Sequence, residues 1–244
     1  MKNDLIFERE RLISSAFIDS SLRLGIAEAA LLMQDNLTEC FFHLQCDGIL
    51  YREKYNAFWV FTKMKLTFTE RPRWLQSVKI ATFPVSNEGM RTNINTAMYR
   101  EDGMLFLAAN LEACALDLTT HRPIKLASLP YPTADFPEPV FTEPFERFGA
   151  EFSEQEHIFD ETIRSQQIDM SRHMNNIEYI KCALNVFSYD FLQSHDVRSI
   201  EVHYAGESRE GQILRVYRHD EANGSLIVIK ESGRTVFKMK IIFR

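Results

Sequence analysis

The residues best suited to chemistry in this sequence lie in one short stretch, 167–182. A carboxylate, an imidazole and two carboxamides fall close together there: Asp169, His173, Asn175 and Asn176. Such a set can hold and activate a water molecule and donate hydrogen bonds to a carbonyl oxygen that gains negative charge. These residues alone favour a simpler alternative, a capped helix whose polar side chains only satisfy backbone amides.

An amphipathic helix is expected to position this cluster. Apolar residues recur from Met174 onwards at three- and four-residue intervals, which predicts a helix over 174–193. Asp169 and Ser171 stand where N-cap residues belong. His173 and Asn176 are three residues apart, so we expect them to project from the same helix face. The free amides and partial positive charge of the helix start would lie beside them.

The cluster resembles a motif of the acyl-acyl carrier protein (acyl-ACP) thioesterases. In that family the second of two hotdog domains carries D-x-N-x-H-x-N-N-x-x-Y, followed by a glutamate on a later strand. The matching residues here are Asp169, His173, Asn175, Asn176 and Tyr179, and Glu207 in H-Y-A-G-E-S has the family's spacing. Segments of the first half, such as F-W-V-F-T-K-M-K-L-T-F-T-E-R-P and V-K-I-A-T-F, resemble the family's strand series. The resemblance covers nearly the whole chain and is to a bacterial member similar to the plant fatty acyl-ACP thioesterases.

Two residues depart from the family pattern. Ser171 stands where the family has the first motif asparagine, so a carboxamide is replaced by a hydroxyl that donates and accepts but reaches less far. Ser208 follows the glutamate, where plant members often carry a cysteine. A thiol nucleophile is therefore excluded at that place.

The resemblance implies a fold and a reaction. The fold would be α+β, a tandem (double) hotdog in which each half is a long helix wrapped by an antiparallel sheet. The protein would be a thiolester hydrolase that converts long-chain fatty acyl-ACP to free fatty acid and holo-ACP, with no cofactor and no metal. Its partner would be acyl carrier protein with the acyl chain on a phosphopantetheine arm, and a homodimer is left open. A hotdog 3-hydroxyacyl-thioester dehydratase and a non-catalytic acyl-thioester-binding protein remain as alternatives.

The resemblance also implies roles for the site residues. Glu207 would act as the base that deprotonates water, or would attack directly to form an anhydride. His173 would orient the water and protonate the leaving sulfur, and Asp169 would fix the imidazole's tautomer or cap the helix. Ser171 would complete the catalytic set in place of the asparagine. The substrate carbonyl would be held by Asn175 and Asn176 together with the helix amides.

The strand pattern leaves two directions open for the Glu207 side chain. Strict alternation from Ile200 puts Glu207 on the opposite face of the strand, with Glu201 and His203. A bulge at Gly206 would reverse its direction and turn it toward the cluster.

The predicted elements occur twice in the same order. Each half begins with a strand and a long helix and continues with antiparallel strands, which is the order of a hotdog. The first half has a strand at 6–18, a helix with a buried stripe from Leu22 to Met33, and strands at 57–69, 77–85, 91–99 and 105–117. The second half has a strand at 157–168, the helix at 174–193, and strands at 199–205, 213–219, 226–231 and 235–243. Residues 41–48 have no clear assignment.

Three segments follow from this repeat. Residues 1–130 are predicted to form an N-terminal hotdog, 131–150 a proline-rich linker, and 151–244 a C-terminal hotdog with the catalytic residues. A shift of 150 residues places His173 on Arg23 and the two asparagines on Gly25 and Ile26, so the first copy lacks the polar cluster. By the resemblance, its task would be to complete the sheet and shape the acyl pocket.

Composition excludes several classes of protein. The chain has 244 residues, 45% of them apolar, and a net charge of -6, which argues against nucleic-acid binding. No apolar run approaches the length of a membrane span and the first residues are charged, so we expect a cytoplasmic protein with no membrane association. The chain has four cysteines: Cys40, Cys46, Cys114 and Cys182. They show no C-x-x-C spacing, which favours buried thiols over a metal site or disulfides.

Overall fold

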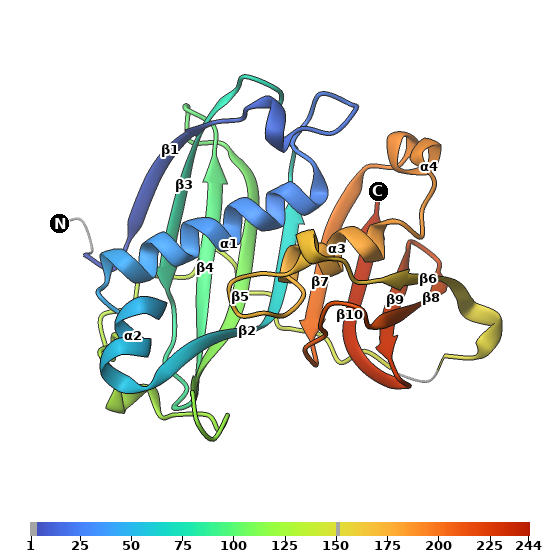
Figure 1. The fold of residues 1–244 in the computed structure, drawn as a ribbon. Coiled ribbons are helices and arrows are strands. Elements are labelled where there is room, and N and C mark those ends of the chain that lie inside the picture. Colours follow the sequence, from blue (N-terminus) through green and yellow to red (C-terminus); the bar gives the residue numbers. More distant parts are fainter. Residues whose placement is uncertain (1–3, 150–151) are drawn as a thin grey trace. The chain divides into compact units, whose positions relative to one another are not determined.

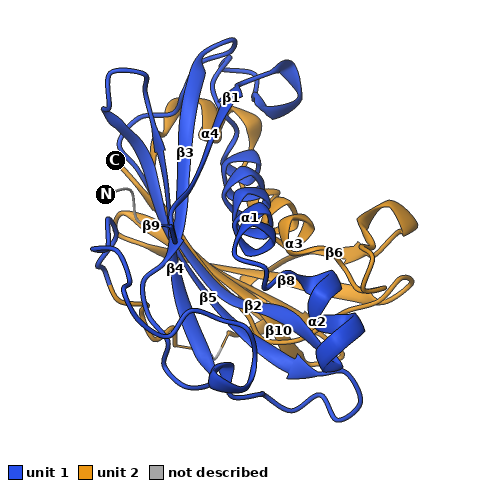
Figure 2. Cartoon of the chain, turned by 90° about the vertical axis from the view of Figure 1, so that its left-hand side faces the viewer, with its two compact units in different colours: residues 1–143 blue, residues 144–244 orange. Residues whose placement is uncertain are grey.

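The computed structural model describes residues 4–149 and 152–244. The chain divides into two compact units, Met1–Glu143 and Pro144–Arg244, shown in different colours in Figure 2. The dividing point lies inside the segment predicted as a linker, 131–150, so residues 131–143 belong to the first unit. Residues 150 and 151, where the linker was predicted to end and the second domain to begin, lie outside the described residues.

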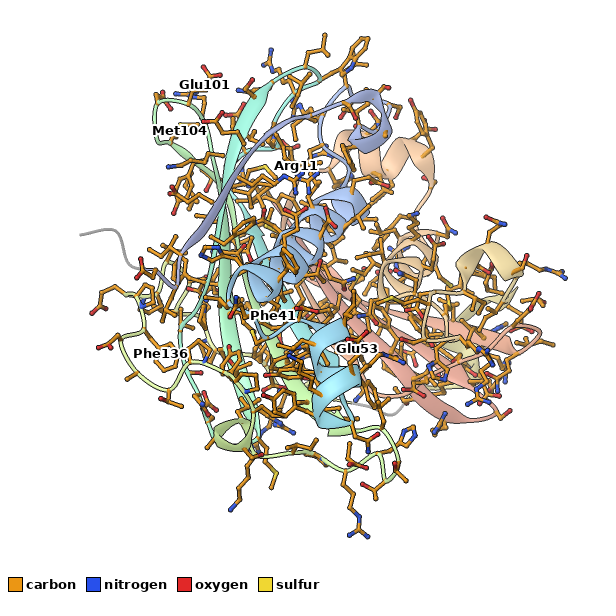
Figure 3. The ribbon with its side chains drawn as sticks, turned by 60° about the vertical axis from the view of Figure 1, so that its left-hand side comes forward. Arg11, Phe41, Glu53, Glu101, Met104 and Phe136 are labelled. Atoms are coloured by element: carbon orange, nitrogen blue, oxygen red, sulfur yellow. The ribbon has the colours of Figure 1, made fainter. Side chains whose placement is uncertain are left out.

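The first unit is a five-stranded antiparallel sheet with a long helix on one face (Figure 1). Its strands are β1 (Phe7–Leu12), β2 (Ala57–Phe68), β3 (Ser77–Pro84), β4 (Arg91–Tyr99) and β5 (Leu105–Asp117), in the order β1-β3-β4-β5-β2. Its helices are α1 (Ile26–His43) and α2 (Gly48–Tyr55). Figure 3 shows Arg11 extending from β1 toward α1, where its guanidinium pairs with Asp35 and Glu39.

The second unit repeats this plan with shorter helices. Its strands are β6 (His157–Thr162), β7 (Val197–Tyr204), β8 (Ile213–Glu221), β9 (Gly224–Glu231) and β10 (Arg234–Phe243), in the order β7-β10-β9-β8-β6. Its helices are α3 (Asn176–Leu184) and α4 (Tyr189–Ser194), and α3 packs on β9 and β10. Each unit is a helix wrapped by an antiparallel sheet, which confirms the predicted α+β double hotdog.

The structure corrects several predicted boundaries. The two leading strands, predicted at 6–18 and 157–168, end at Leu12 and Thr162, and a short 3-10 turn follows each of them, at Ser15–Phe17 and Ser165–Gln167. The helix predicted at 174–193 is two helices, because Ser188 caps a new one by accepting a hydrogen bond from the Phe191 amide.

The unassigned segment 41–48 contains a helix boundary. Residues up to His43 complete α1, and Asp47 caps α2 by accepting hydrogen bonds from the amides of Ile49 and Leu50. The predicted stripe of α1 is buried from Ile26 to Met33, but Leu22 lies outside the helix and is exposed. All four cysteines are buried, and burial raises the pKa of Cys40 and Cys182 to about 12, so they are neutral packing groups.

The proline-rich segment is ordered against the sheet of each unit. In the first unit the Phe141 amide donates to the buried Asn95, and the Phe141 ring packs on small residues of β4 and β5. In the second unit the Glu146 amide donates to the buried carboxylate of Glu201 at 2.7 Å, and Phe148 stacks on His203 with ring centroids 4.2 Å apart. These contacts hold the segment against strands of both sheets.

Candidate active site

The predicted catalytic cluster begins in a tight turn that precedes α3. The Asp169 amide donates to the His173 carbonyl at 2.9 Å, and the Arg172 amide donates to the Asp169 carbonyl at 3.0 Å. The Asp169 carboxylate accepts a hydrogen bond of 2.7 Å from the Ser171 amide, which is the local bond that makes aspartate common in turns. Arg172 adopts a left-handed conformation with φ 65°. His173 is thus presented at the end of a closed turn.

The helix start differs from the prediction. Asn175, rather than Asp169 or Ser171, is the N-cap of α3, and its Oδ1 accepts a hydrogen bond of 2.8 Å from the Ile177 amide. The earlier residues cannot cap the helix because their turn precedes it. Asn176 is the first helical residue, so the prediction that His173 and Asn176 share a helix face is wrong.

The structure brings His173 and Glu207 together. The distance between His173 Nε2 and Glu207 Oε2 is 3.1 Å. The His173 side chain is 19% exposed and the Glu207 side chain 51%, so the pair lies at the surface of the unit and Glu207 can meet solvent. A hydrogen bond of 2.8 Å from the Met174 amide to the Ser208 carbonyl joins the two segments next to this contact.

A β-bulge at the end of β7 directs Glu207 toward His173. The amides of Ala205 and Gly206 both donate to the Val236 carbonyl, at 2.8 and 3.1 Å. Two residues therefore face one residue of β10, which reverses the alternation of side chains beyond this point. The bulge considered for Gly206 is present, and Glu207 leaves the face that carries Glu201.

The other predicted site residues lie near this pair in different settings. Ser171 is exposed, and Asp169 is half-buried with its carboxylate on the Ser171 amide. Between Asp169 and the His173 imidazole, both within the described part of the chain, the structure has no hydrogen bond. Asn175 and Asn176 are half-buried at the start of α3. No group of three or more His, Cys, Asp or Glu residues in 4–149 and 152–244 is arranged to hold a metal.

Two buried hydroxyls beside Glu207 were not predicted as part of the site. Tyr179 is 2% exposed and stacks on Phe237 with centroids 5.5 Å apart, and Ser208 is fully buried. Burial raises the pKa of Tyr179, while the neighbouring Ser208 hydroxyl opposes the shift, so Tyr179 stays neutral. The sequence identified Tyr179 only as a residue that matches the family motif and assigned it no role.

The first unit contains the same turn with different chemistry. The Asp19 amide donates to the Arg23 carbonyl at 2.9 Å, and the Ser21 amide donates to the Asp19 carboxylate at 2.8 Å. The Leu24 amide donates to the Pro72 carbonyl at 2.8 Å, the counterpart of the bond from Met174 to Ser208. The residue before Pro72 is Arg71, which therefore stands where the second unit has Glu207.

Arg71 forms an ion pair in place of a catalytic contact. Its guanidinium pairs with Asp19 and donates to the Leu24 carbonyl at 3.1 Å, and its side chain is 9% exposed. Arg23 stands at the place of His173, and Gly25 at the place of the cap Asn175. The first unit keeps the turn and its aspartate, but Arg23, Arg71 and Gly25 stand in place of His173, Glu207 and Asn175.

Comparison with known proteins agrees with this architecture. Residues 151–244 match the family model described as the acyl-ACP thioesterase C-terminal domain. An acyl-ACP thioesterase structure from Bacteroides thetaiotaomicron is 20% identical, with a TM-score of 0.88 over 99% of this chain and 98% of that one. A 12:0-ACP thioesterase from Umbellularia californica is 14% identical, with a TM-score of 0.85 over 98% and 97% of the two chains.

At these sequence identities the structural likeness shows the fold alone. The family model adds a match of residues 151–244 to a thioesterase domain. No curated protein sequence matches the chain. No helix in 4–149 or 152–244 is long and apolar enough to cross a membrane. The chain thus has a double-hotdog fold, and its residues 151–244 match the C-terminal domain of the acyl-ACP thioesterases, a family of thiolester hydrolases.

Proposed function

We propose that this protein hydrolyses long-chain fatty acyl-ACP to a free fatty acid and holo-ACP, in the cytoplasm, at the His173–Glu207 pair. The observation that carries the proposal is the 3.1 Å contact between these two side chains beside the start of α3. The family match of residues 151–244 supports a thioester as the bond that is cleaved. Acyl carrier protein, which presents the substrate on its phosphopantetheine arm, is the proposed partner.

The contact between the two side chains provides a route for the protons. Glu207 takes a proton from water, and the hydroxide adds to the thioester carbonyl carbon. The tetrahedral intermediate collapses with cleavage of the C–S bond, and the leaving sulfur takes a proton from His173 Nε2. Glu207 then returns its proton to the imidazole across the 3.1 Å contact, which restores the starting state. One water and one thioester give one acid and one thiol.

The start of α3 is the proposed site for the carbonyl oxygen. Asn175 uses its side-chain oxygen as the helix cap, so its amide nitrogen faces away from that bond and can donate to the substrate. The partial positive charge of the helix end favours the developing oxyanion. Asn176 is the second proposed contact. In this scheme Asp169 shapes the turn that carries His173, and Ser171 lies at its exposed edge.

Release of free thiol from acyl-ACP and acyl-CoA of several chain lengths tests the proposal. Glu207→Gln keeps the shape and removes the charge, and we expect it to lower kcat by about 10²- to 10⁴-fold. Glu210→Gln is the matched control, because Glu210 is an exposed carboxylate in the same loop. Equal activity of Glu207→Gln and wild type would refute the assignment of the base.

His173→Ala and Asp169→Asn separate chemistry from turn geometry. We expect His173→Ala to abolish thiol release without changing the circular dichroism spectrum. Asp169→Asn retains an acceptor for the Ser171 amide, so it should keep most of the activity. Formation of an enoyl thioester without thiol release would instead favour a dehydratase, and the absence of both products would favour a binding protein.

A further inference from the structure

Four large apolar side chains are exposed together at one end of the first unit. Leu12, Leu22, Trp74 and Leu75 are 51%, 56%, 47% and 60% exposed, and we call them the apolar turn patch. Their segments are joined by backbone contacts: the Trp74 amide donates to the Leu22 carbonyl at 2.9 Å, and the Leu75 amide to the Ile13 carbonyl at 2.9 Å. The two turns lie at the upper end of this unit in Figure 1, before α1 and before β3.

The geometry of the turns does not require these side chains. Leu22 and Leu75 have φ angles of 58° and 62°, a left-handed conformation that disfavours leucine. The hydrogen bond from Leu75 to Ile13 recurs in the second unit, where the Gly211 amide donates to the Ile163 carbonyl at 3.0 Å. The counterparts of the patch there are polar or lack a side chain: Thr162, Arg172, Glu210 and Gly211. The exposed apolar surface is therefore specific to the first unit.

The two turns of the patch carry positive charge. Arg23 and Arg73 adjoin the patch, and their backbones form an antiparallel β-bridge. The nearby carboxylate, Asp19, is neutralised by Arg71. Residues 20–23 and 72–76 contain no aspartate or glutamate, although the whole chain has a net charge of -6. An apolar tip flanked by arginines complements a surface with negative charge outside and hydrocarbon beneath it.

We propose that the apolar turn patch docks this protein reversibly on anionic lipid bilayers. Trp74 and the leucines would enter the boundary between head groups and acyl chains, and Arg23 and Arg73 would lie against the phosphates. An acidic protein surface would complement the arginines but would leave the turn-tip leucines and Trp74 less well buried. The docking site is independent of the His173–Glu207 chemistry, so either proposal can fail alone.

Tryptophan fluorescence reports directly on this patch. The chain has only two tryptophans, and Trp59 is packed among aromatic rings with its indole N–H donating to the Cys46 carbonyl at 2.8 Å. We expect vesicles of phosphatidylcholine with phosphatidylglycerol to shift the emission to the blue and to co-sediment with the protein. Pure phosphatidylcholine vesicles should bind at least about tenfold less, and added salt should weaken binding to the anionic ones.

The second unit supplies the variant that tests the patch. Trp74→Glu with Leu75→Gly installs the residues of its equivalent turn, and glycine fits the φ of 62° without strain, so folding should be preserved. We expect this variant, and Arg73→Glu alone, to lose sedimentation with anionic vesicles. Ile49→Glu and Arg52→Glu, at exposed sites on α2, are the apolar and charge controls and should bind as wild type does.

Three outcomes would overturn the proposal. The first is that wild-type protein does not sediment with anionic vesicles, and the second is that the Trp74→Glu, Leu75→Gly variant binds them equally well. The third is that the same variant abolishes a concentration-dependent dimer or binding to holo-carrier protein while vesicles have no effect on wild type. That result would assign the patch to a protein partner.

Discussion

Arg71 and Glu207 occupy equivalent places in the two repeated turns, and their removal should have opposite consequences. Arg71→Met removes a guanidinium that is 9% exposed and leaves Asp19 without its cation. Breaking a buried ion pair costs about 3–5 kcal/mol, but Asp19 is 29% exposed and keeps the Ser21 amide, so we expect about 2 kcal/mol. For a chain of this size that lowers the melting temperature by about 4–8 °C. Glu207→Gln should leave the melting temperature nearly unchanged and lower kcat by about 10²- to 10⁴-fold.

Thermal melting and thiol release, measured on the same preparations, test this pair of expectations. Arg71→Met should retain thiol release at 25 °C, well below its melting temperature. Asp19→Asn combined with Arg71→Met removes the uncompensated charge and should recover part of the lost stability. An Arg71→Met enzyme with wild-type melting and no activity would refute the reasoning, because the first turn would then take part in the chemistry.

Three further predictions concern the turns and the helix start. Burial alone would raise the pKa of Asp19, but the hydrogen bonds from Ser21 and Arg71 prevail and lower it from 3.8. The resulting stability is present above that value and lost as pH falls below it, so the urea midpoints of wild type and Asp19→Asn should converge as the pH falls below 3.8. Asn175→Ala removes the α3 cap and should cost about 1 kcal/mol in urea unfolding. Ser171→Asn changes an exposed residue, so thiol release should be equal to or faster than wild type, and a large loss would show that this turn differs from the family's.

Much of the fold could be predicted because the strands carry strong local patterns. The predicted bounds of β4 and β5 are confirmed, since a turn containing Gly103 separates the two strands and β5 is a strongly apolar run. The short helix α2 was missed because its eight residues are too few to show helical periodicity. The split between α3 and α4 depends on the cap at Ser188, a single hydrogen bond that the apolar rhythm does not reveal.

The site could be predicted less completely than the fold. The meeting of His173 and Glu207, 34 positions apart in the chain, depends on the bulge before Glu207, and alternation alone pointed the other way. The cap was assigned to the wrong residue because Asp169 and Asn175 have similar capping preferences, and only the hydrogen bonds of the turn distinguish them. The ion pair between Asp19 and Arg71 could not be predicted from the sequence. The shift of 150 residues that aligns the two turns does not align Arg71 with Glu207.

The shared carbonyl of Val236 also determines which genetic changes this site can tolerate. Substitutions at Ala205 leave the number of residues between β7 and Glu207 unchanged, so the carboxylate keeps its direction. Deletion of Ala205 would retain every proposed catalytic group yet remove the extra residue, and Glu207 would then face away from His173. The contact between His173 and Glu207 therefore depends on the number of residues between β7 and Glu207 more than on their identity. An insertion or deletion there would separate the pair.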